Sequence, residues 1–346
     1  MDPLLLMSRF TPDREKLAEN GNLGFSLKID PIPHRRYREV MFRMAELHLR
    51  RRRHGTSAGL LIMAPSGAGK STLAEAYEKS FPKQYEAERT YIPVLLVSVP
   101  STPTSRSLAG EILVKLGASR LDRGSSPERT AAIIKLIRKC GVELIIFNEA
   151  QHLLCPPTLV AFRDLTDWLK SFMDESGVSI VAFGLPEAEQ VIESNEQLHR
   201  RFSERMSLSP FSLSDEEDFR EFRGILKAYE AKLPLPVETP LYEANLARRM
   251  HVASWGLLDY VVKTLEGAVA SATLDGKDCI DLAALAAGFK QKVWNHVPDT
   301  LNPFFPESPL RPLDRPGECF DKHLKFDPIG SPAARKLALN LSRGGR

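Results

Sequence analysis

The chain has 346 residues, a formal net charge of +3 at pH 7, 43% hydrophobic residues and 26% charged residues. These values fit an ordinary soluble protein with room for two domains, or for one large domain with an appendage. No window approaches the roughly 20 apolar residues of a membrane span, and the N-terminus lacks a secretory layout. We therefore expect a cytosolic protein without a membrane partner. Its four cysteines are scattered singly and are expected to be reduced thiols: Cys140, Cys155, Cys279 and Cys319.

The first segment, residues 1–33, carries Pro and Gly with little periodicity and is predicted to form an extended arm. A helix is predicted over residues 34–54, where Val40, Met44 and Leu47 recur at helical spacing. The helix ends in four consecutive arginines, 50–53. They are either a solvated helix end, whose cations suit the C-terminal dipole, or a contact to phosphates or an acidic partner.

The most informative stretch is Ala64-Pro-Ser-Gly-Ala-Gly-Lys-Ser71, which lies between the apolar run 59–63 and the helix-forming segment 72–77. Strand, Gly-rich loop and helix in this order are typical of a phosphate-binding loop. The glycines let backbone N–H groups face phosphates, Lys70 supplies a charge, and the Ser71 hydroxyl suits a metal ion. The usual first Gly is replaced by Ala64, and the alternative is a chance Gly-rich turn. We predict that a nucleoside triphosphate contacts Pro65, Ser66, Gly67, Ala68, Gly69, Lys70, Ser71 and Thr72.

Strand and helix patterns alternate after this loop. Strands are predicted over residues 92–99, 142–147, 178–183 and 206–208, and the intervening helices over 107–116, 128–140 and 159–171. This alternation predicts a parallel sheet covered on both faces, a doubly wound α/β domain. Helical patterns at 215–231, 240–250, 256–272 and 281–293 predict a small all-helical lid. Beyond Trp294, prolines at 298, 303, 306, 309, 312 and 316 predict an irregular tail. The predicted regions are the arm, 1–33; the nucleotide-binding domain, 34–213; the lid, 214–296; and the tail, 297–346.

The strand ending at Phe147 delivers Asn148 and Glu149 to the carboxyl edge of the sheet, where ligands of such folds bind. Phosphate-loop ATPases normally carry Asp-Glu here, the Asp for the magnesium shell and the Glu to polarise the attacking water. Asn148 can accept a hydrogen bond from a magnesium-bound water but lacks the charge, so we expect slow hydrolysis with nucleotide binding preserved. Ser71 and Asn148 are the predicted metal site, and Glu149 is the predicted base. The alternative for Glu149 is an acidic helix N-cap.

A basic pair, Arg200 and Arg201, follows the strand at 178–183 and precedes the last strand. Ring-forming ATPases place here the arginine that reaches a neighbouring subunit's nucleotide and stabilises charge in trans. Arg201 is the first choice for this role and Arg200 the second. The alternative is a surface salt bridge to Glu196 or Glu204.

The order of these motifs resembles that of AAA+ ATPases, and more narrowly the TniB/TnsC group of DNA-transposition regulators. The resemblance covers roughly residues 35–320. It rests on the loop at 64–71, on Phe147-Asn-Glu-Ala-Gln-His-Leu153, on the Gly-x-Pro-Glu turn at 184–187 and on Leu198–Phe202. The tail residues Leu301-Asn-Pro-Phe304, Arg311-Pro-Leu313 and Pro316-Gly-Glu318 are also similar to TniB-type tails. The implied fold is an AAA+ P-loop domain with a small all-helical lid.

The resemblance implies an ATPase of the prokaryotic cytosol that uses ATP and Mg²⁺ and assembles as a ring or helical filament on duplex DNA. It implies that the assembly selects the target and contacts a DDE transposase and a TniQ-like selector. In this family, loops facing the channel follow the second strand, which here places Thr104, Ser105 and Arg106 at phosphates. Such contacts carry no base information and predict sequence-independent binding. The alternative is a helix N-cap with a solvated Arg; further DNA candidates are Lys115 and Arg120.

Several residues depart from the family pattern. Position 185, often polar to sense the γ-phosphate, is Leu, and the Arg expected near Tyr260 is missing. His152 either positions water or nucleotide or is a structural histidine. With Ala64 and Asn148, these departures suggest a slow ATPase whose nucleotide acts as a structural switch. Two other functions stay open: another AAA+ DNA-remodelling or loader ATPase, and a non-hydrolysing, ATP-gated adaptor.

Overall fold

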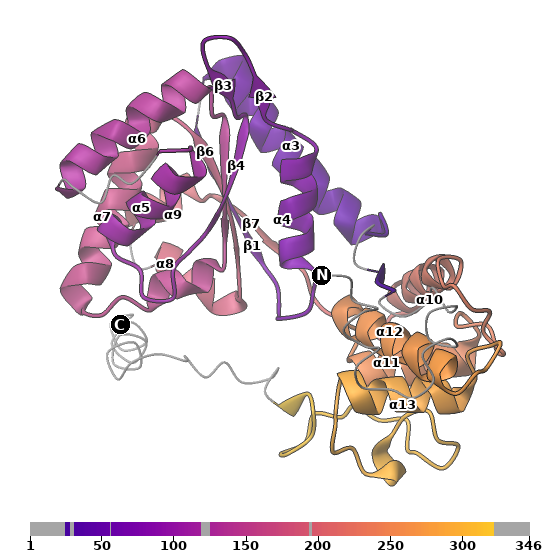
Figure 1. The fold of residues 1–346 in the computed structure, drawn as a ribbon. Coiled ribbons are helices and arrows are strands. Elements are labelled where there is room, and N and C mark those ends of the chain that lie inside the picture. The colour runs from indigo at the N-terminus through magenta and orange to yellow at the C-terminus, as the bar shows by residue number, and fades with distance from the viewer. Residues whose placement is uncertain (1–24, 28–30, 56, 119–124, 194–195, 322–346) are drawn as a thin grey trace, which may run out of the picture. The chain divides into compact units, whose positions relative to one another are not determined.

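The computed structural model describes residues 25–27, 31–55, 57–118, 125–193 and 196–321. These residues separate into two compact units (Figure 1). One, the α/β unit, contains the described residues between 36 and 209. The other, the helical unit, contains the described residues before 36 and after 209. Within the described ranges, no helix is both long and apolar enough to cross a membrane.

The α/β unit is built on a five-stranded sheet with the order β4-β5-β6-β1-β7. Every neighbouring pair is parallel. The strands are β1 (Gly59–Met63), β4 (Val94–Ser98), β5 (Leu144–Asn148), β6 (Ser179–Gly184) and β7 (Glu204–Ser207). The three central strands are buried along nearly their whole length, as their continuous apolar runs require. The predicted parallel α/β sheet is confirmed.

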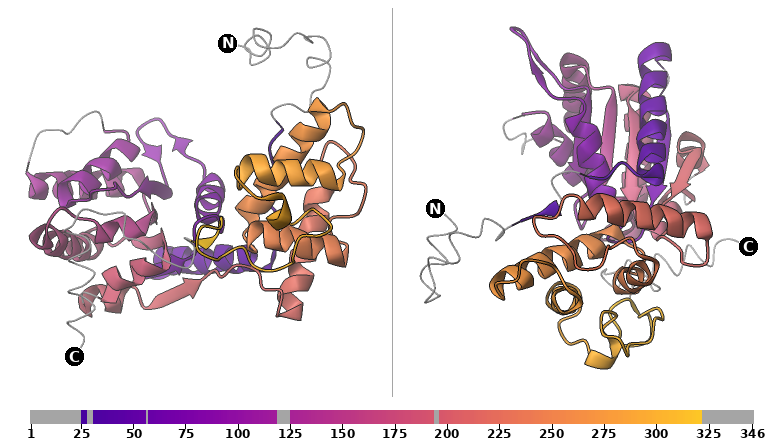
Figure 2. Two further views of the ribbon diagram at one scale, coloured as in Figure 1. Left: turned by 90° about the horizontal axis from the view of Figure 1, so that it is seen from below. Right: turned by 90° about the vertical axis from the view of Figure 1, so that its right-hand side faces the viewer.

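Helices cover both faces of this sheet, as Figures 1 and 2 show. Alternate residues of each strand point to opposite faces, so Leu60 and Ile62 pack in one core and Leu61 and Met63 in the other. The first face is covered by α3 (Arg35–His54) and α4 (Lys70–Lys79), and the second by α5 (Ser105–Lys115), α6 (Ser126–Cys140) and α7 (Leu159–Ser176). The sheet is therefore the middle layer of three.

Short elements complete the unit. Strands β2 (Gln84–Tyr85) and β3 (Thr90–Tyr91) form a short antiparallel hairpin. We did not predict it from the sequence, because strands of two residues are too short to show a periodic pattern. The turns after β5 and β6 contain η2 (Ala150–Leu154) and η3 (Pro186–Ala188). Two short helices, α8 (Glu189–Glu193) and α9 (Glu196–Arg201), then lead into β7.

The helical unit contains α10 (Glu216–Glu230), α11 (Ala244–Ser254), α12 (Leu258–Leu274), α13 (Leu282–Lys292) and the short turn η4 (Asp299–Leu301). Helices α12 and α13 approach each other closely at two glycines. A Cβ on Gly288 would lie 2.4 Å from the Thr264 carbonyl oxygen, and one on Gly267 would lie 2.7 Å from the Cα of Gly288. Larger side chains at these positions would force the two helices apart.

The core of the helical unit is completed by segments that precede and follow the α/β unit in the sequence. Leu27 is buried in it, and its N–H donates to the Glu266 carboxylate at 2.9 Å. From the other side, Phe304, Leu313 and Phe320 are each at most 1% exposed. Residues 297–321 have little regular structure, in agreement with the irregular tail that we predicted, but they pack into the helical unit.

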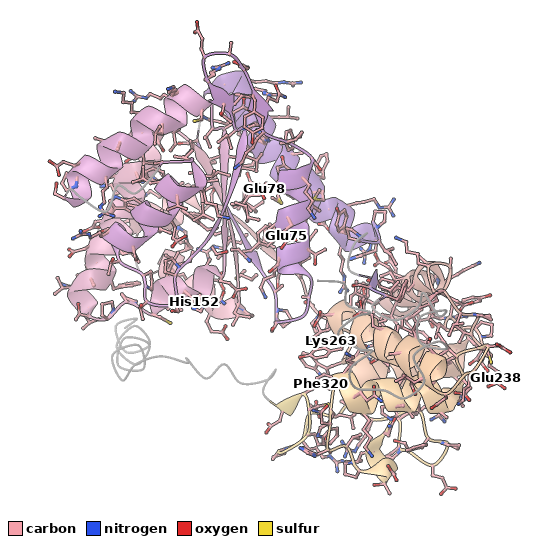
Figure 3. The ribbon with its side chains drawn as sticks, in the orientation of Figure 1. Glu75, Glu78, His152, Glu238, Lys263 and Phe320 are labelled. Carbon is pink, nitrogen blue, oxygen red and sulfur yellow. The ribbon has the colours of Figure 1, made fainter. Side chains whose placement is uncertain are left out.

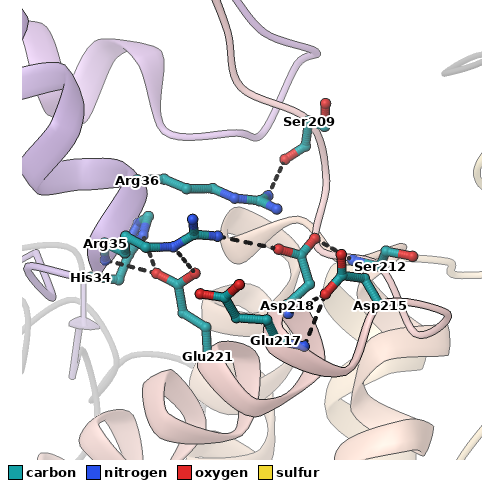
Figure 4. A network of polar contacts seen from close by, with 9 residues as sticks. All are labelled: His34, Arg35, Arg36, Ser209, Ser212, Asp215, Glu217, Asp218 and Glu221. Carbon is teal, nitrogen blue, oxygen red and sulfur yellow. Dashed lines mark hydrogen bonds and ion pairs between the residues drawn. The ribbon is translucent and has the colours of Figure 1, made fainter.

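Two sets of polar contacts lie near the points where the chain passes between the units (Figure 4). In the helical unit, the Arg35 side chain donates to Glu221 at 3.3 Å, and Asp215 caps α10 by accepting from two backbone N–H groups. In the α/β unit, Arg36 donates to the Ser209 carbonyl oxygen at 2.6 Å. Arg35, the first residue of α3, is thus bonded within the helical unit, whereas Arg36 is bonded within the α/β unit.

Candidate nucleotide-binding site

The loop between β1 and α4 has the backbone of an anion cradle. Gly67 and Gly69 have φ angles of 83° and 88°, which L side chains rarely adopt. Gly69 is the N-cap residue of α4 and supplies no side-chain cap, so the first N–H groups of the helix remain for a ligand. The Ala64 N–H donates to the Gly184 carbonyl oxygen at 3.0 Å, which ties the loop to β6, the strand beside β1 in the sheet.

Lys70 is buried in this loop, with a relative exposure of 6%. Its ammonium donates to the carbonyl oxygens of Ala64 and Pro65, both at 2.9 Å. Burial lowers the pKa of Lys70 to about 8, against the opposing effect of the nearby carboxylates of Glu149 and Glu187. The ammonium is thus held at the loop by carbonyl dipoles and two acidic groups, in a position to meet phosphate oxygens.

Asn148 lies beside Ser71, as the sequence predicts for a metal site. Its amide nitrogen donates to the Ser71 hydroxyl at 3.1 Å. Its amide oxygen is buried and has no hydrogen-bond partner among the described residues. An orphaned buried acceptor beside a hydroxyl fits a hydrated Mg²⁺, whose bound waters are donors. The residues present therefore suit the metal, although the amide contributes no negative charge.

Glu149 follows Asn148 with a backbone φ of 60° and ψ of 41°, in the left-handed region. It is the N-cap residue of η2, as the alternative proposed, but its side chain makes no cap hydrogen bond. Its carboxylate instead accepts from the side-chain amide of Gln151, a residue that we did not predict to matter. His152 lies half-buried in the same turn, at the carboxyl end of the strands (Figure 3), and its part in the site stays a prediction.

The comparisons with known proteins agree with this geometry. A family model described as bacterial TniB protein matches residues 28–212. The chain belongs to the TniB family. No curated protein sequence matches it.

Solved structures with the same fold identify the architecture of this TniB protein. The Aeropyrum pernix ORC2 protein, in its ADPNP-ADP complexes, has a TM-score of 0.58 at 17% identity, over 76% of this chain and 69% of that one. The Aeropyrum pernix ORC1 protein, in complex with DNA, has a TM-score of 0.57 at 17% identity, over 78% and 68%. Cdc6p from Pyrobaculum aerophilum has a TM-score of 0.55 at 15% identity, over 78% and 70%. The likeness shows the AAA+ P-loop fold that we predicted.

The two arginines predicted to act in trans are engaged within the chain. Arg200 pairs with Glu196 at 2.5 Å, as one alternative proposed. Arg201 pairs with Asp174 of α7, a partner that we did not predict. Glu204, the other expected partner, instead pairs with Arg50 at 2.9 Å. Both arginines lie in or near the last turn of α9, and their action on a neighbouring subunit stays a proposal.

Thr104 is the N-cap residue of α5. Its hydroxyl accepts from the Ser107 N–H at 3.1 Å, and the Ser107 hydroxyl accepts from the Thr104 N–H at 2.9 Å. The Thr104 hydroxyl therefore caps the helix, which is the alternative that we gave to a DNA contact for this residue. Ser105 opens the helix and Arg106 is exposed beside it, so a phosphate contact from these two stays a prediction. Of the further candidates, Lys115 is exposed at the end of α5, whereas Arg120 lies outside the described residues.

The arginine run at the end of α3 is mostly engaged inside the α/β unit. Arg50 pairs with Glu204, Arg51 donates to the Gly55 carbonyl oxygen at 3.0 Å, and Arg52 pairs with Glu143 at 3.1 Å. These contacts favour the interpretation of the run as a structural helix end.

Residues at two positions compared with the family above, one in the lid and one in the tail, make packing contacts in this TniB protein. Tyr260, at the position that lacks the expected Arg, packs edge-on against Phe320 at a centroid distance of 5.2 Å. The Lys263 ammonium lies 5.0 Å from the Tyr260 ring centroid, and Figure 3 labels Lys263 and Phe320 in the same unit. In the tail motif, buried Asn302 donates to the Ala286 carbonyl oxygen at 3.0 Å. The tail residues that resemble the family thus hold the unit together.

Proposed function

We propose that this TniB protein binds ATP with Mg²⁺ at the loop 64–71 and hydrolyses it slowly. The observation that carries the proposal is the convergence of four groups at the carboxyl ends of β1 and β5: the Lys70 ammonium, the Ser71 hydroxyl, the Asn148 amide and the Glu149 carboxylate. These are the group types that position a phosphoryl transfer to water. Pro65, Ser66, Ala68 and Thr72 complete the proposed cradle.

Each residue has a distinct part in this proposal. Lys70 neutralises phosphate charge, and the N–H groups of the α4 start bind phosphate oxygens. Ser71 and Asn148 would hold Mg²⁺, which supplies charge neutralisation of the transferring phosphoryl group when bound. Glu149 accepts the proton of the attacking water. Because Asn148 is neutral, we infer that turnover is slow and that the bound nucleotide acts mainly as a switch.

We propose further that nucleotide binding drives assembly of this protein, as a ring or filament, on duplex DNA for the regulation of transposition. Membership of the TniB family supports this proposal, together with the exposed Arg106 and the half-buried Ser105 at the start of α5. A ligand that binds better at a subunit boundary than to the free subunit shifts the equilibrium toward assembly. A DDE transposase and a TniQ-like selector are the proposed protein partners, and Arg201, or Arg200, is the proposed contribution to the neighbouring site.

The test is fluorescence anisotropy of a labelled random-sequence duplex with the full chain. ATP, a slowly hydrolysed analogue, ADP and no nucleotide are compared at two salt concentrations. We expect cooperative, salt-sensitive binding that requires a triphosphate. K70A should abolish it, whereas K79A, which removes the same charge from the exposed end of the same helix, should leave it unchanged. Binding indifferent to nucleotide would contradict the proposal.

One specific observation favours a second function. The neutral Asn148 makes a non-hydrolysing, ATP-gated adaptor the leading alternative to the enzyme. Phosphate release stimulated by DNA supports the enzyme, whereas assembly without phosphate release supports the adaptor. The fold likeness to ORC and Cdc6 proteins keeps a loader ATPase as a third possibility, and that possibility differs from the first chiefly in its partners.

A further inference from the structure

The Gln151 side chain bridges two strand ends of the candidate site. It is 6% exposed, and both ends of its amide are bonded. The nitrogen donates to the Glu149 carboxylate, and the oxygen accepts from the Leu185 backbone N–H at 3.1 Å. The orientation of the amide is fixed, because a backbone N–H can only donate and a carboxylate can only accept. Gln151 therefore joins the turn after β5 to the turn after β6.

The chain around this bridge is under local strain. Glu149 and Trp255 are the only described residues other than glycine with a positive φ. A left-handed conformation is unfavourable for an L-residue, so surrounding contacts must hold Glu149 in it. The bond from Gln151, two residues further on, is one such contact and acts directly on the carboxylate.

The bridge continues to the phosphate loop through main-chain contacts. A Cβ on Gly184 would lie 3.3 Å from the backbone nitrogen of Gln151 and 2.6 Å from the Ala188 Cβ, so η2 and η3 pack directly on the end of β6. The Gly184 carbonyl oxygen accepts from the Ala64 N–H at 3.0 Å. One continuous set of contacts thus runs from the loop, through Gly184 and Leu185, to Gln151 and the Glu149 carboxylate.

We propose that Gln151 is a positioning residue that holds the Glu149 carboxylate and couples it, through the Leu185 main chain, to the phosphate loop. The inference rests on the proposed ATPase function. The Leu185 side chain has no polar group with which to contact a phosphate. In this protein the connection between the loop and the base therefore runs through the Leu185 backbone N–H and the Gln151 amide.

Two substitutions separate the bonds of this amide. Q151M keeps the length of the side chain and removes both hydrogen bonds. Q151E keeps an acceptor for the Leu185 N–H, loses the donor to Glu149 and places a like charge beside it. If Gln151 orients the base, both variants lose turnover, because a displacement of about 1 Å costs on the order of 10²-fold in rate. Nucleotide affinity of Q151M should stay within about twofold of the unsubstituted chain, since this variant adds no charge and leaves the loop and Lys70 unchanged.

The experiment measures ATP affinity and single-turnover hydrolysis of the full chain, with the melting temperature as a check on folding. Q84M is the matched control, since Gln84 is exposed on the β2–β3 hairpin of the same unit. We expect a loss of about 10²-fold in hydrolysis for Q151M and Q151E and no loss for Q84M. Hydrolysis of both Gln151 variants at the unsubstituted rate would overturn the proposal. If Q151M does not fold, Q151E alone decides, since it keeps the Leu185 bond.

A double-mutant cycle with Glu149 distinguishes positioning from a general structural role. In an E149Q background, Q151M should cause no further loss of hydrolysis, because the group that it positions is already gone. Losses that add in full would show that Gln151 acts elsewhere and would overturn the inference. If E149Q alone hydrolyses at the unsubstituted rate, the proposed ATPase mechanism fails instead. The two failures therefore give different results.

Discussion

At the scale of the residue, the fold alters the acid–base chemistry of Lys70. Its ammonium donates to two carbonyls of its own loop, and burial lowers its pKa to about 8. A bound triphosphate favours the charged form of Lys70 and so raises this pKa. Binding of nucleotide and binding of a proton are therefore linked at this one side chain.

The linkage predicts a pH dependence of ATP binding. Above about pH 8 the free chain carries a mostly neutral Lys70. Binding must then take up a proton, and the ATP affinity falls as the pH rises. Calorimetry at pH 8.5 in two buffers of different ionisation enthalpy should show net proton uptake, and K79A should show the same uptake. Equal heats in the two buffers would show that no proton is taken up on binding and would contradict the lowered pKa of Lys70.

Asn148 predicts a gain of function on substitution. N148D places a charge beside Ser71 where the amide oxygen now lacks a partner. We expect faster hydrolysis and a fall on the order of tenfold in the Mg²⁺ concentration for half-maximal nucleotide binding, equivalent to about 1.4 kcal/mol. Titration of fluorescent nucleotide binding with Mg²⁺ measures this, and N148D with S71A should lose most of the gain. An unchanged rate and midpoint would count against the proposed metal site.

At the scale of the element, the start of α5 combines a helix cap with a proposed DNA contact, and substitutions can separate the two. Thr104 exchanges hydrogen bonds with Ser107 and so stabilises the helix, whereas Arg106 is exposed beside it. The helix cap and the proposed DNA contact thus lie two positions apart, at the start of the same helix.

T104A should lower the free energy of unfolding by about 1 kcal/mol, because it leaves an N–H group of the first turn without its cap. T104S keeps a hydroxyl and should restore most of that stability. We expect T104A to bind duplex DNA almost normally, and R106A to bind more weakly and with a smaller salt dependence. Urea unfolding and DNA anisotropy test the two expectations. A large loss of DNA binding in T104A at unchanged stability would assign the hydroxyl to DNA.

At the scale of the whole molecule, Arg201 is the first choice for the residue that acts outside its own chain in the proposed oligomer. In the structure Arg201 pairs with Asp174 of the same chain. Assembly must therefore exchange this contact for one to a neighbouring nucleotide, and D174A should favour the exchange.

Mixing of variants tests this role. R201A and E149Q should each be nearly inactive alone, because one lacks the trans arginine and the other lacks the base. In a 1:1 mixture about one quarter of the boundaries combine an intact Glu149 with an intact Arg201, so hydrolysis should reappear. R200A mixed 1:1 with E149Q is the control and should show about half the rate of R200A alone per total chain, because only half of the boundaries keep an intact Glu149. A mixture as inactive as its parts would show that Arg201 does not act in trans.

The sequence predicts the parallel sheet, the loop and the residues at its strand ends because each follows from a local pattern. The apolar run of β5 and the glycines around Lys70 are such patterns. Gln151 was missed because its bond to Leu185 joins residues 34 positions apart, through a backbone group that any residue carries. The Arg201–Asp174 pair was missed for the same reason. The packing of Phe320 against Tyr260 depends on tertiary contacts, which the prolines around Phe320 obscure in the sequence.

The helical core also bears on the order in which the chain folds during synthesis. It joins Leu27 to Phe320, and nearly the whole α/β sequence lies between them. The core cannot close until the ribosome has released residues beyond 300, whereas the α/β unit has all its strands once residue 207 has emerged. Domains generally fold as units while the chain is being made. The helical unit is therefore the later to form, and a stalled or shortened translation product would carry a finished sheet beside exposed apolar helices.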